Sequence, residues 1–170
     1  GQQVRRASGV LLRANAGEVR PVAGAWVVLH RVGPGRAGPL DSVRSDARGR
    51  FAFRYTPTGD SAVYFASSMY AGIAYFTSPF TAPDVSGADA ELTVFDTTSV
   101  GARVATRSRH IVVFAAEDRG MRRMSEVFWL ENTGTRTRVP AGQAPSWQSL
   151  LPTGAAGVRV DEGDIAGQAV

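Results

Sequence analysis

Residues 21–53 constrain the fold more than any other part of the chain. They hold a run of β-branched and aromatic residues at 25–31, then a loop rich in Gly and Pro, and then Phe51 and Phe53 alternating with small or polar neighbours. Runs of this kind, bounded by turn residues, are typical of β-strands that bury one face. Apolar stripes at helical spacing are scarce elsewhere, so the sequence predicts an all-β protein.

The first half reads as short strands joined by turns. Residues 33–39 are predicted to form a loop because Gly and Pro dominate them. A hairpin is predicted from two arms, 41–44 and 50–55, around a turn at 46–49 in which Gly49 is free to adopt a positive φ. The other strands expected here are 9–12, 25–31, 62–68 and 72–77, preceded by a polar arm at 1–6.

A domain boundary is expected near residue 90. Residues 79–90 are rich in Pro, Ala, Asp, Ser and Gly, which is typical of a linker or long loop. We therefore expect two small antiparallel β-sandwich domains, 1–90 and 91–170, with a strand at 91–95 that closes the first or opens the second. Only four or five strands are legible in the second half, too few for a closed sandwich, which predicts an open edge or groove. They lie at 91–95, 103–115, 121–131, 137–139 and 157–160.

Composition removes several classes of function. The net charge is +4, and all 19 basic residues are Arg, spread over both halves instead of forming the basic stripe that nucleic-acid binding requires. The absence of cysteine excludes a disulfide framework and thiolate metal sites. No apolar run is long enough to span a bilayer. The chain begins with Gly-Gln-Gln-Val and no Met, which suits an exported extracellular or cell-surface protein after removal of a leader and suits a shortened chain equally well; we expect export.

No group of residues forms a recognisable catalytic or metal site. The two histidines, His30 and His110, lie in predicted strands and lack ligand spacing. A Ser-His-Asp set built from His110 and Asp96 has no nucleophile-elbow motif to support it. The acidic cluster Asp161, Glu162 and Asp164 lacks the spacing of a calcium loop and is interpreted as a solvated turn. We therefore expect no enzyme activity, metal or cofactor.

Residues 21–53 resemble a known family. The residues that carry the resemblance are Pro21-Val22-Ala23-Gly24-Ala25, the strand 26–29, and then Asp46, Gly49, Arg50, Phe51 and Phe53. They are similar to the carboxypeptidase regulatory-like domain, a transthyretin-like (prealbumin-like) β-sandwich, over roughly the first ninety residues. The resemblance implies a scaffold, adhesive or accessory module of an exported bacterial protein, and it implies no active site.

Two functions remain as hypotheses. The first is a non-catalytic exported subunit of an extracellular filament or surface assembly, a homo-oligomer held by sandwich packing and by strand donation between copies. The candidate assembly residues are those of the arm: Gly1, Gln2, Gln3, Val4, Arg5 and Arg6. The alternative is a carbohydrate-binding or adhesive module for extracellular polysaccharide, in which exposed aromatic rings stack on sugars. The candidate contacts are Tyr64, Tyr70 and Tyr75.

Overall fold

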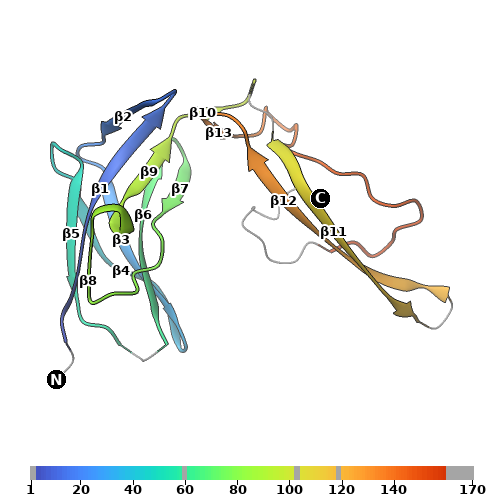
Figure 1. Cartoon of the computed structure of the whole chain (residues 1–170), viewed down its shortest axis with the longest axis horizontal. Coiled ribbons are helices and arrows are strands. Elements are labelled where there is room, and N and C mark those ends of the chain that lie inside the picture. Colours follow the sequence, from blue (N-terminus) through green and yellow to red (C-terminus); the bar gives the residue numbers. More distant parts are fainter. Residues whose placement is uncertain (1–2, 59–60, 102–103, 118–119, 160–170) are drawn as a thin grey trace. The chain divides into compact units, whose positions relative to one another are not determined.

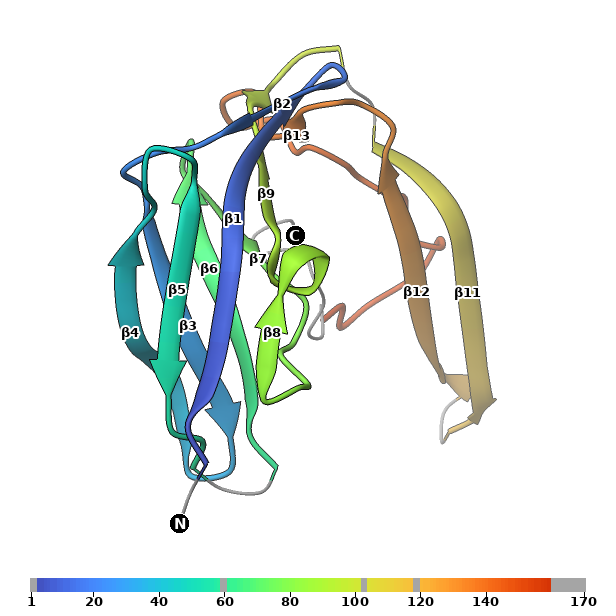
Figure 2. The ribbon, with the colours of Figure 1, turned by 60° about the vertical axis from the view of Figure 1, so that its left-hand side comes forward.

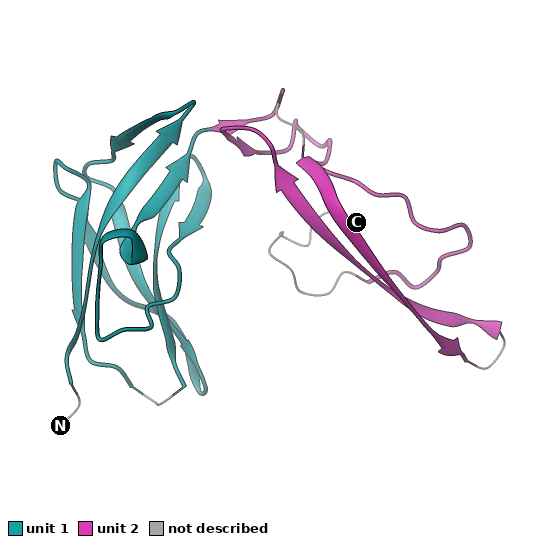
Figure 3. Cartoon of the chain, in the orientation of Figure 1, with its two compact units in different colours: residues 1–96 teal, residues 97–170 magenta. Residues whose placement is uncertain are grey.

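The computed structural model describes residues 3–58, 61–101, 104–117 and 120–159. The chain divides into two compact units, residues 1–96 and 97–170 (Figure 3). The predicted all-β class is confirmed: the described residues form strands, a short 3-10 helix η1 (Gly87–Ala90), and no α-helix. No helix formed by these residues is long and apolar enough to cross a membrane.

Strand β1 (Arg5–Asn15) organises the first sheet of unit 1. It pairs antiparallel with β5 (Arg50–Tyr55) and β2 (Glu18–Pro21), and parallel with β8 (Asp84–Ser86) and β9 (Leu92–Phe95). Figure 2 shows β5 on one side of β1, and β8 and β9 on the other. The strand predicted at 91–95 therefore closes unit 1, and β8 comes from the region before it that we expected to be irregular.

The second sheet has the order β4 (Arg36–Arg44), β3 (Trp26–Gly33), β6 (Val63–Tyr70) and β7 (Ile73–Phe76), and all its pairs are antiparallel (Figure 1). The prediction of a loop at 33–39 was wrong. Gly33 pairs with Arg36, so β3 and β4 form a hairpin around Pro34-Gly35, where Gly35 has a φ of 75°. Pro39 is tolerated because β4 is an edge strand and the register shifts beside it.

The predicted hairpin of 41–44 with 50–55 was also wrong, although its turn forms. The Asp46 carboxylate accepts the backbone N–H groups of Arg48 and Arg50, each at 2.8 Å, and Gly49 has a φ of 74°. However, β4 and β5 belong to different sheets, so this turn carries the chain from one layer to the other. The same local hydrogen bonds would form in a hairpin turn and in a turn that connects two sheets. The buried side chains of β5 decide that it pairs with β1.

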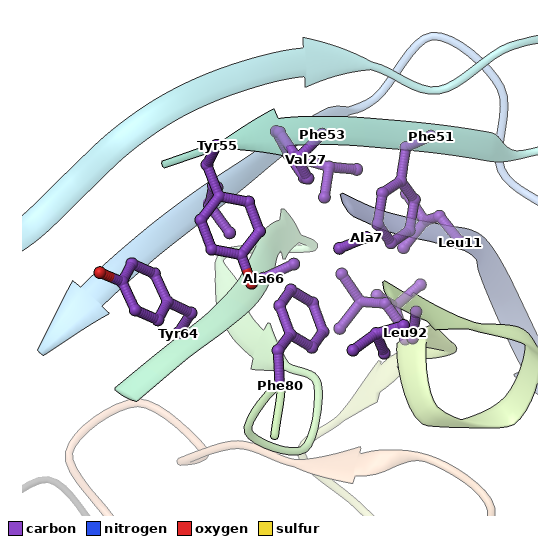
Figure 4. Packing of buried hydrophobic residues seen from close by; sticks show 14 residues of the cluster. Ala7, Leu11, Val27, Phe51, Phe53, Tyr55, Tyr64, Ala66, Phe80 and Leu92 are labelled. Atoms are coloured by element: carbon purple, nitrogen blue, oxygen red, sulfur yellow. The ribbon is translucent and has the colours of Figure 1, made fainter. Parts of the chain in front are cut away.

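The core of unit 1 lies between the two sheets. On β5, buried and exposed residues alternate along the whole strand, so Phe51, Phe53 and Tyr55 point inward. Figure 4 shows side chains of Phe51, Tyr55, Phe80 and Leu92 converging between the layers. The buried cluster consists of Ala7, Leu11, Val27, Leu29, Phe51, Phe53, Tyr55, Tyr64, Ala66, Phe80, Val85, Ala90, Leu92 and Val94. Unit 1 is thus a β-sandwich with a continuous core.

Unit 2 is built around one long two-stranded ribbon, β11 (Val104–Ala116) paired antiparallel with β12 (Arg122–Asn132). A two-residue parallel pair joins β10 (Thr97–Thr98) to β13 (Thr137–Arg138). The strands predicted at 103–115, 121–131 and 137–139 are confirmed, with bounds that differ by a residue or so. Of the strand predicted at 157–160, residues 157–159 form no strand and residue 160 lies outside the described residues. Of the residues described between 97 and 159, none is buried. The ribbon therefore has no core of its own within the described part of the chain.

Candidate interaction surfaces

One candidate surface is the outer face of the four-stranded sheet in unit 1, which we call the aromatic face. Val27 and Leu29 on β3, and Tyr64 and Ala66 on β6, point into the core, so the residues between them point outward. Large apolar side chains are exposed on this face, and Phe76 leaves 59% of its surface accessible. The exposed members are Trp26, Val32, Val63, Met69 and Phe76. Patches of this kind on soluble domains usually mark contact sites.

The rings on the aromatic face already contact one another. His30 stacks on Phe65 with centroids 5.2 Å apart and planes 13° from parallel, and Phe65 meets Phe76 edge-on at 5.8 Å. The guanidinium of Arg44 lies over the Trp26 ring, 4.4 Å from its centroid. Several ring surfaces are therefore used within the protein, which leaves less room for a stacked sugar than the exposed area suggests.

The hydrogen bond between His30 and Ser67 resembles the histidine–serine pair of a catalytic triad. His30 Nε2 lies 2.7 Å from Ser67 Oγ, and partial burial lowers the pKa of the imidazole, which favours its neutral form. The hydroxyl belongs to a buried residue. Within the described part of the chain, no carboxylate forms a hydrogen bond or ion pair with this histidine, so the orienting group of a triad is missing there. The geometry is that of a hydrogen bond that fixes a packed ring.

The three tyrosines proposed as sugar contacts do not share an open surface. Tyr64 is only 1% exposed, and its hydroxyl accepts the backbone N–H of Thr58 at 2.8 Å. Tyr70 donates to Asp96 at 3.0 Å, Tyr75 donates to the carbonyl of Phe95 at 2.9 Å, and both pack against the core. The exposed aromatic residues of the aromatic face are Trp26 and Phe76. Strand alternation was the available signal, because Tyr64 and Phe65 must face opposite sides.

The arm proposed for assembly is largely part of the sandwich. Arg5 and Arg6 lie in β1, opposite Tyr55 and Arg54 of β5, and Arg6 also pairs with Asp84 of β8. Gln3 and Val4 precede the strand, and Gly1 and Gln2 lie outside the described residues. Donation of β1 to another copy would first have to break these pairs.

The second candidate surface is one face of the ribbon, which we call the Trp129 face. Residues paired across an antiparallel ladder share a face, so the register assigns this face directly. Its members are Ala105, Ser108, His110, Val112 and Phe114 of β11, and Arg123, Ser125, Val127, Trp129 and Glu131 of β12. Four large apolar side chains among them stay exposed: Val112, Phe114, Val127 and Trp129, the last at 59%.

The opposite face of the ribbon is partly covered by the chain itself. Trp147 meets the Phe128 ring edge-on at 5.0 Å, and its indole N–H donates to Thr106 at 3.2 Å. Arg109 binds the Glu126 carboxylate through two nitrogens, at 2.8 and 3.1 Å, and lies 5.3 Å from the centre of the Phe128 ring. The two faces of the ribbon thus differ in what covers them. The opposite face also exposes Ile111, Val113 and Met124, but Trp147 and the Arg109–Glu126 ion pair cover part of it.

Charges of opposite sign mark the two ends of the Trp129 face. At one end Glu131 is paired with Arg107, whose hydrogen bond lowers the pKa of the carboxyl group. At the other end Arg123 lies over the Phe114 ring, 4.4 Å from its centroid. Between them His110 contacts Trp129 edge-on at 5.3 Å. The face is an apolar stripe with an acidic residue at one end and a basic residue at the other.

Neither a metal-binding cluster among the described residues nor a similarity to known proteins adds a candidate functional site. The acidic cluster of Asp161, Glu162 and Asp164 lies outside the described residues, and among those described no three His, Asp or Glu side chains are placed to hold a metal ion. No protein-family model matches this chain, and no curated protein is significantly similar to it in sequence. The aromatic face and the Trp129 face are therefore the two surfaces that can indicate a function.

Proposed function

We propose that this chain is a non-catalytic structural subunit whose copies associate through exposed apolar sheet faces. The observation that carries the proposal is the ribbon: no described residue of unit 2 is buried, although four large apolar side chains line one face. A two-stranded ribbon is marginally stable in water unless something packs on it. A second copy would supply that contact.

The presence of two such surfaces favours an extended assembly. The aromatic face belongs to unit 1 and the Trp129 face to unit 2. A single self-complementary contact closes into a dimer, whereas two different contacts on one chain allow growth into filaments or layers. We place the assembly outside the cell, because the stretch 21–53 resembles modules found on exported bacterial proteins.

Carbohydrate binding is the second candidate, and the exposed Trp26 and Phe76 side chains favour it. Arg44 already lies over Trp26, and this argues for a protein partner over a sugar. The test is a glycan-array and pull-down panel with extracellular polysaccharides. Binding by the wild type that is lost in both Trp26→Ala and Phe76→Ala, and kept in Met69→Ala, would favour this candidate.

Sedimentation velocity over a wide range of concentrations, with electron microscopy of the same samples, tests the assembly directly. We expect the mean mass to rise with concentration and regular oligomers or filaments to appear. A chain that stays monomeric at about 1 mM, where even weak contacts between copies are populated, would refute the proposal.

A further inference from the structure

We infer that two copies pack their Trp129 faces together about a two-fold axis through Val127, so that Arg123 of each copy lies opposite Glu131 of the other. This inference rests on the proposed function and specifies one of its contacts. A two-fold contact uses the same patch on both copies, so the patch must be complementary to itself. Three features of the Trp129 face meet that condition.

The first feature is charge. On β12 the Trp129 face carries residues 123, 125, 127, 129 and 131, with Val127 at the midpoint. Rotation about an axis through Val127 exchanges the two ends of the strand, so each arginine meets a glutamate that is also paired with Arg107 of its own copy. Opposite charges placed across an interface fix its register and disfavour wrong pairings.

The second feature is size. The same rotation places Trp129 of one copy opposite Ser125 of the other, and places Val127 opposite itself. Packed sheets interdigitate most closely where a large side chain faces a small one. Ser125 pairs across the ribbon with Val112, so the partner's indole would rest on a small residue beside an apolar one.

The third feature is the poor fit of the alternative arrangement. If the two ribbons ran in the same direction with β12 stacked on β12, Arg123 would face Arg123, Glu131 would face Glu131, and both indoles would compete for the same space. Like charges in direct opposition are unfavourable. Edge-to-edge pairing of ribbons would leave the apolar stripe exposed, so it does not account for Val127 and Trp129.

The contact is expected to be weak in isolation. From residue 123 to residue 131 the stripe is about 27 Å long at roughly 3.4 Å per residue, and two strands are about 10 Å wide. That footprint is well below the roughly 800 Å² per partner of a standard stable interface. Association should therefore be measured up to about 1 mM, and multivalency within an assembly would strengthen it.

The decisive experiment mixes two charge-reversed variants of the full chain. Arg123→Glu alone and Glu131→Arg alone each place like charges opposite one another, so each should self-associate at least tenfold more weakly than wild type. In a mixture, the introduced glutamate of one variant faces the introduced arginine of the other. We expect the mixture to recover near wild-type affinity as a one-to-one heterodimer, measured by sedimentation with one variant labelled.

The mixture also distinguishes loss of the contact between copies from a local disturbance of the fold. The Glu131→Arg variant places a second arginine beside Arg107, and a purely local disturbance would persist after mixing. Arg122→Glu is the matched control, because Arg122 is adjacent in sequence but outside the Trp129 face, and it should leave association unchanged. Circular dichroism of each variant verifies that the fold is intact.

A cross-linking pair gives an independent readout. The chain has no cysteine, so single thiols can be introduced cleanly. Val127→Cys should cross-link to itself through a bismaleimide of about 10 Å, the spacing of packed sheets. Val113→Cys, a comparably exposed valine on the other face, should not.

The possible outcomes separate the two proposals. Oligomers that form without heterodimer rescue and without Val127→Cys cross-links would overturn the two-fold contact and leave the structural role intact. A chain that is monomeric throughout would overturn both.

Discussion

Both units of this chain are built from β-strands, but only unit 1 forms a buried core in its described residues. Among the described residues of unit 1, nine strands form two sheets and bury fourteen hydrophobic residues between them. In unit 2, the longest strands pair only with each other, and no described residue between 97 and 159 is buried. Backbone pairing alone thus makes a ribbon, whereas a second layer makes a domain. We propose that unit 2 obtains its second layer from a partner.

The sharpest contrast is expected from removing one phenylalanine in each unit. Phe53 is 2% exposed in the core, whereas Phe114 is 38% exposed on the ribbon. Phe53→Ala should lower the free energy of unfolding of unit 1 by about 3–5 kcal/mol, because it removes a buried ring and leaves a cavity. Phe114→Ala should change that free energy by less than about 0.5 kcal/mol. Urea denaturation at a monomeric concentration measures both, and equal losses would contradict the contrast.

A smaller effect is expected from adding a methyl group inside unit 1. A Cβ on Gly9 would lie 2.0 Å from the Ala90 carbonyl oxygen and 2.5 Å from Phe51 Cζ. Gly9→Ala should therefore destabilise unit 1 by roughly 1–3 kcal/mol through overpacking. Gly17 is the matched control, because its φ of 88° strains an alanine but its Cβ would meet nothing within 4 Å.

Gly17→Ala should cost only the local backbone strain, about 1–2 kcal/mol, and should leave the core intact. Near-ultraviolet circular dichroism distinguishes the two cases, because only the Gly9 variant should alter the environment of the aromatic rings in the core. Unchanged aromatic signals in Gly9→Ala would show that the contact between β1 and η1 is looser than the structure indicates.

The smallest expected effect is on the stability of the folded state at low pH. The backbone N–H groups of Arg50 and Arg48 lower the pKa of Asp46 in unit 1, and Arg107 lowers that of Glu131 in unit 2. A carboxyl group whose pKa is lower in the folded state stabilises that state above its ordinary pKa of about 4, and the effect is lost as pH falls through the folded value.

Asp46→Asn should therefore flatten the decline in the stability of unit 1 below pH 4, whereas Glu131→Gln should leave that decline unchanged. Thermal melts of unit 1 between pH 2 and 6 measure the difference. An identical acid response in wild type and Asp46→Asn would show that the turn does not depend on the carboxylate.

The sequence predicted most strands but fewer of their partners. Alternation and turn residues are local, so they identify β5, β6, β11 and β12 well. They cannot say that β5 pairs with β1 across a long stretch of chain, nor that residues 84–86 join the same strand in parallel. Those pairings depend on which long-range contacts bury the most apolar surface.

The candidate surfaces show the same limit. The sequence predicts Tyr64, Tyr70 and Tyr75 as sugar contacts, but choosing exposed rings requires knowing which face of each strand meets the core. Alternation separates Tyr64 from Phe65, yet it cannot say which of the two faces inward. The Trp129 face was missed because β11 and β12 read as ordinary half-buried strands, and only the three-dimensional arrangement shows that no described residue of either strand is buried.

Amide hydrogen exchange at two protein concentrations would show whether the ribbon of unit 2 is stable only when copies associate. At a few micromolar, where we expect a monomer, amides of β1, β3 and β6 should be strongly protected, and those of β11 and β12 should exchange rapidly. At about 1 mM the ribbon should gain at least tenfold protection while unit 1 stays unchanged. A ribbon that is as protected as β1 at the low concentration would show that unit 2 is stable alone, and would contradict the account.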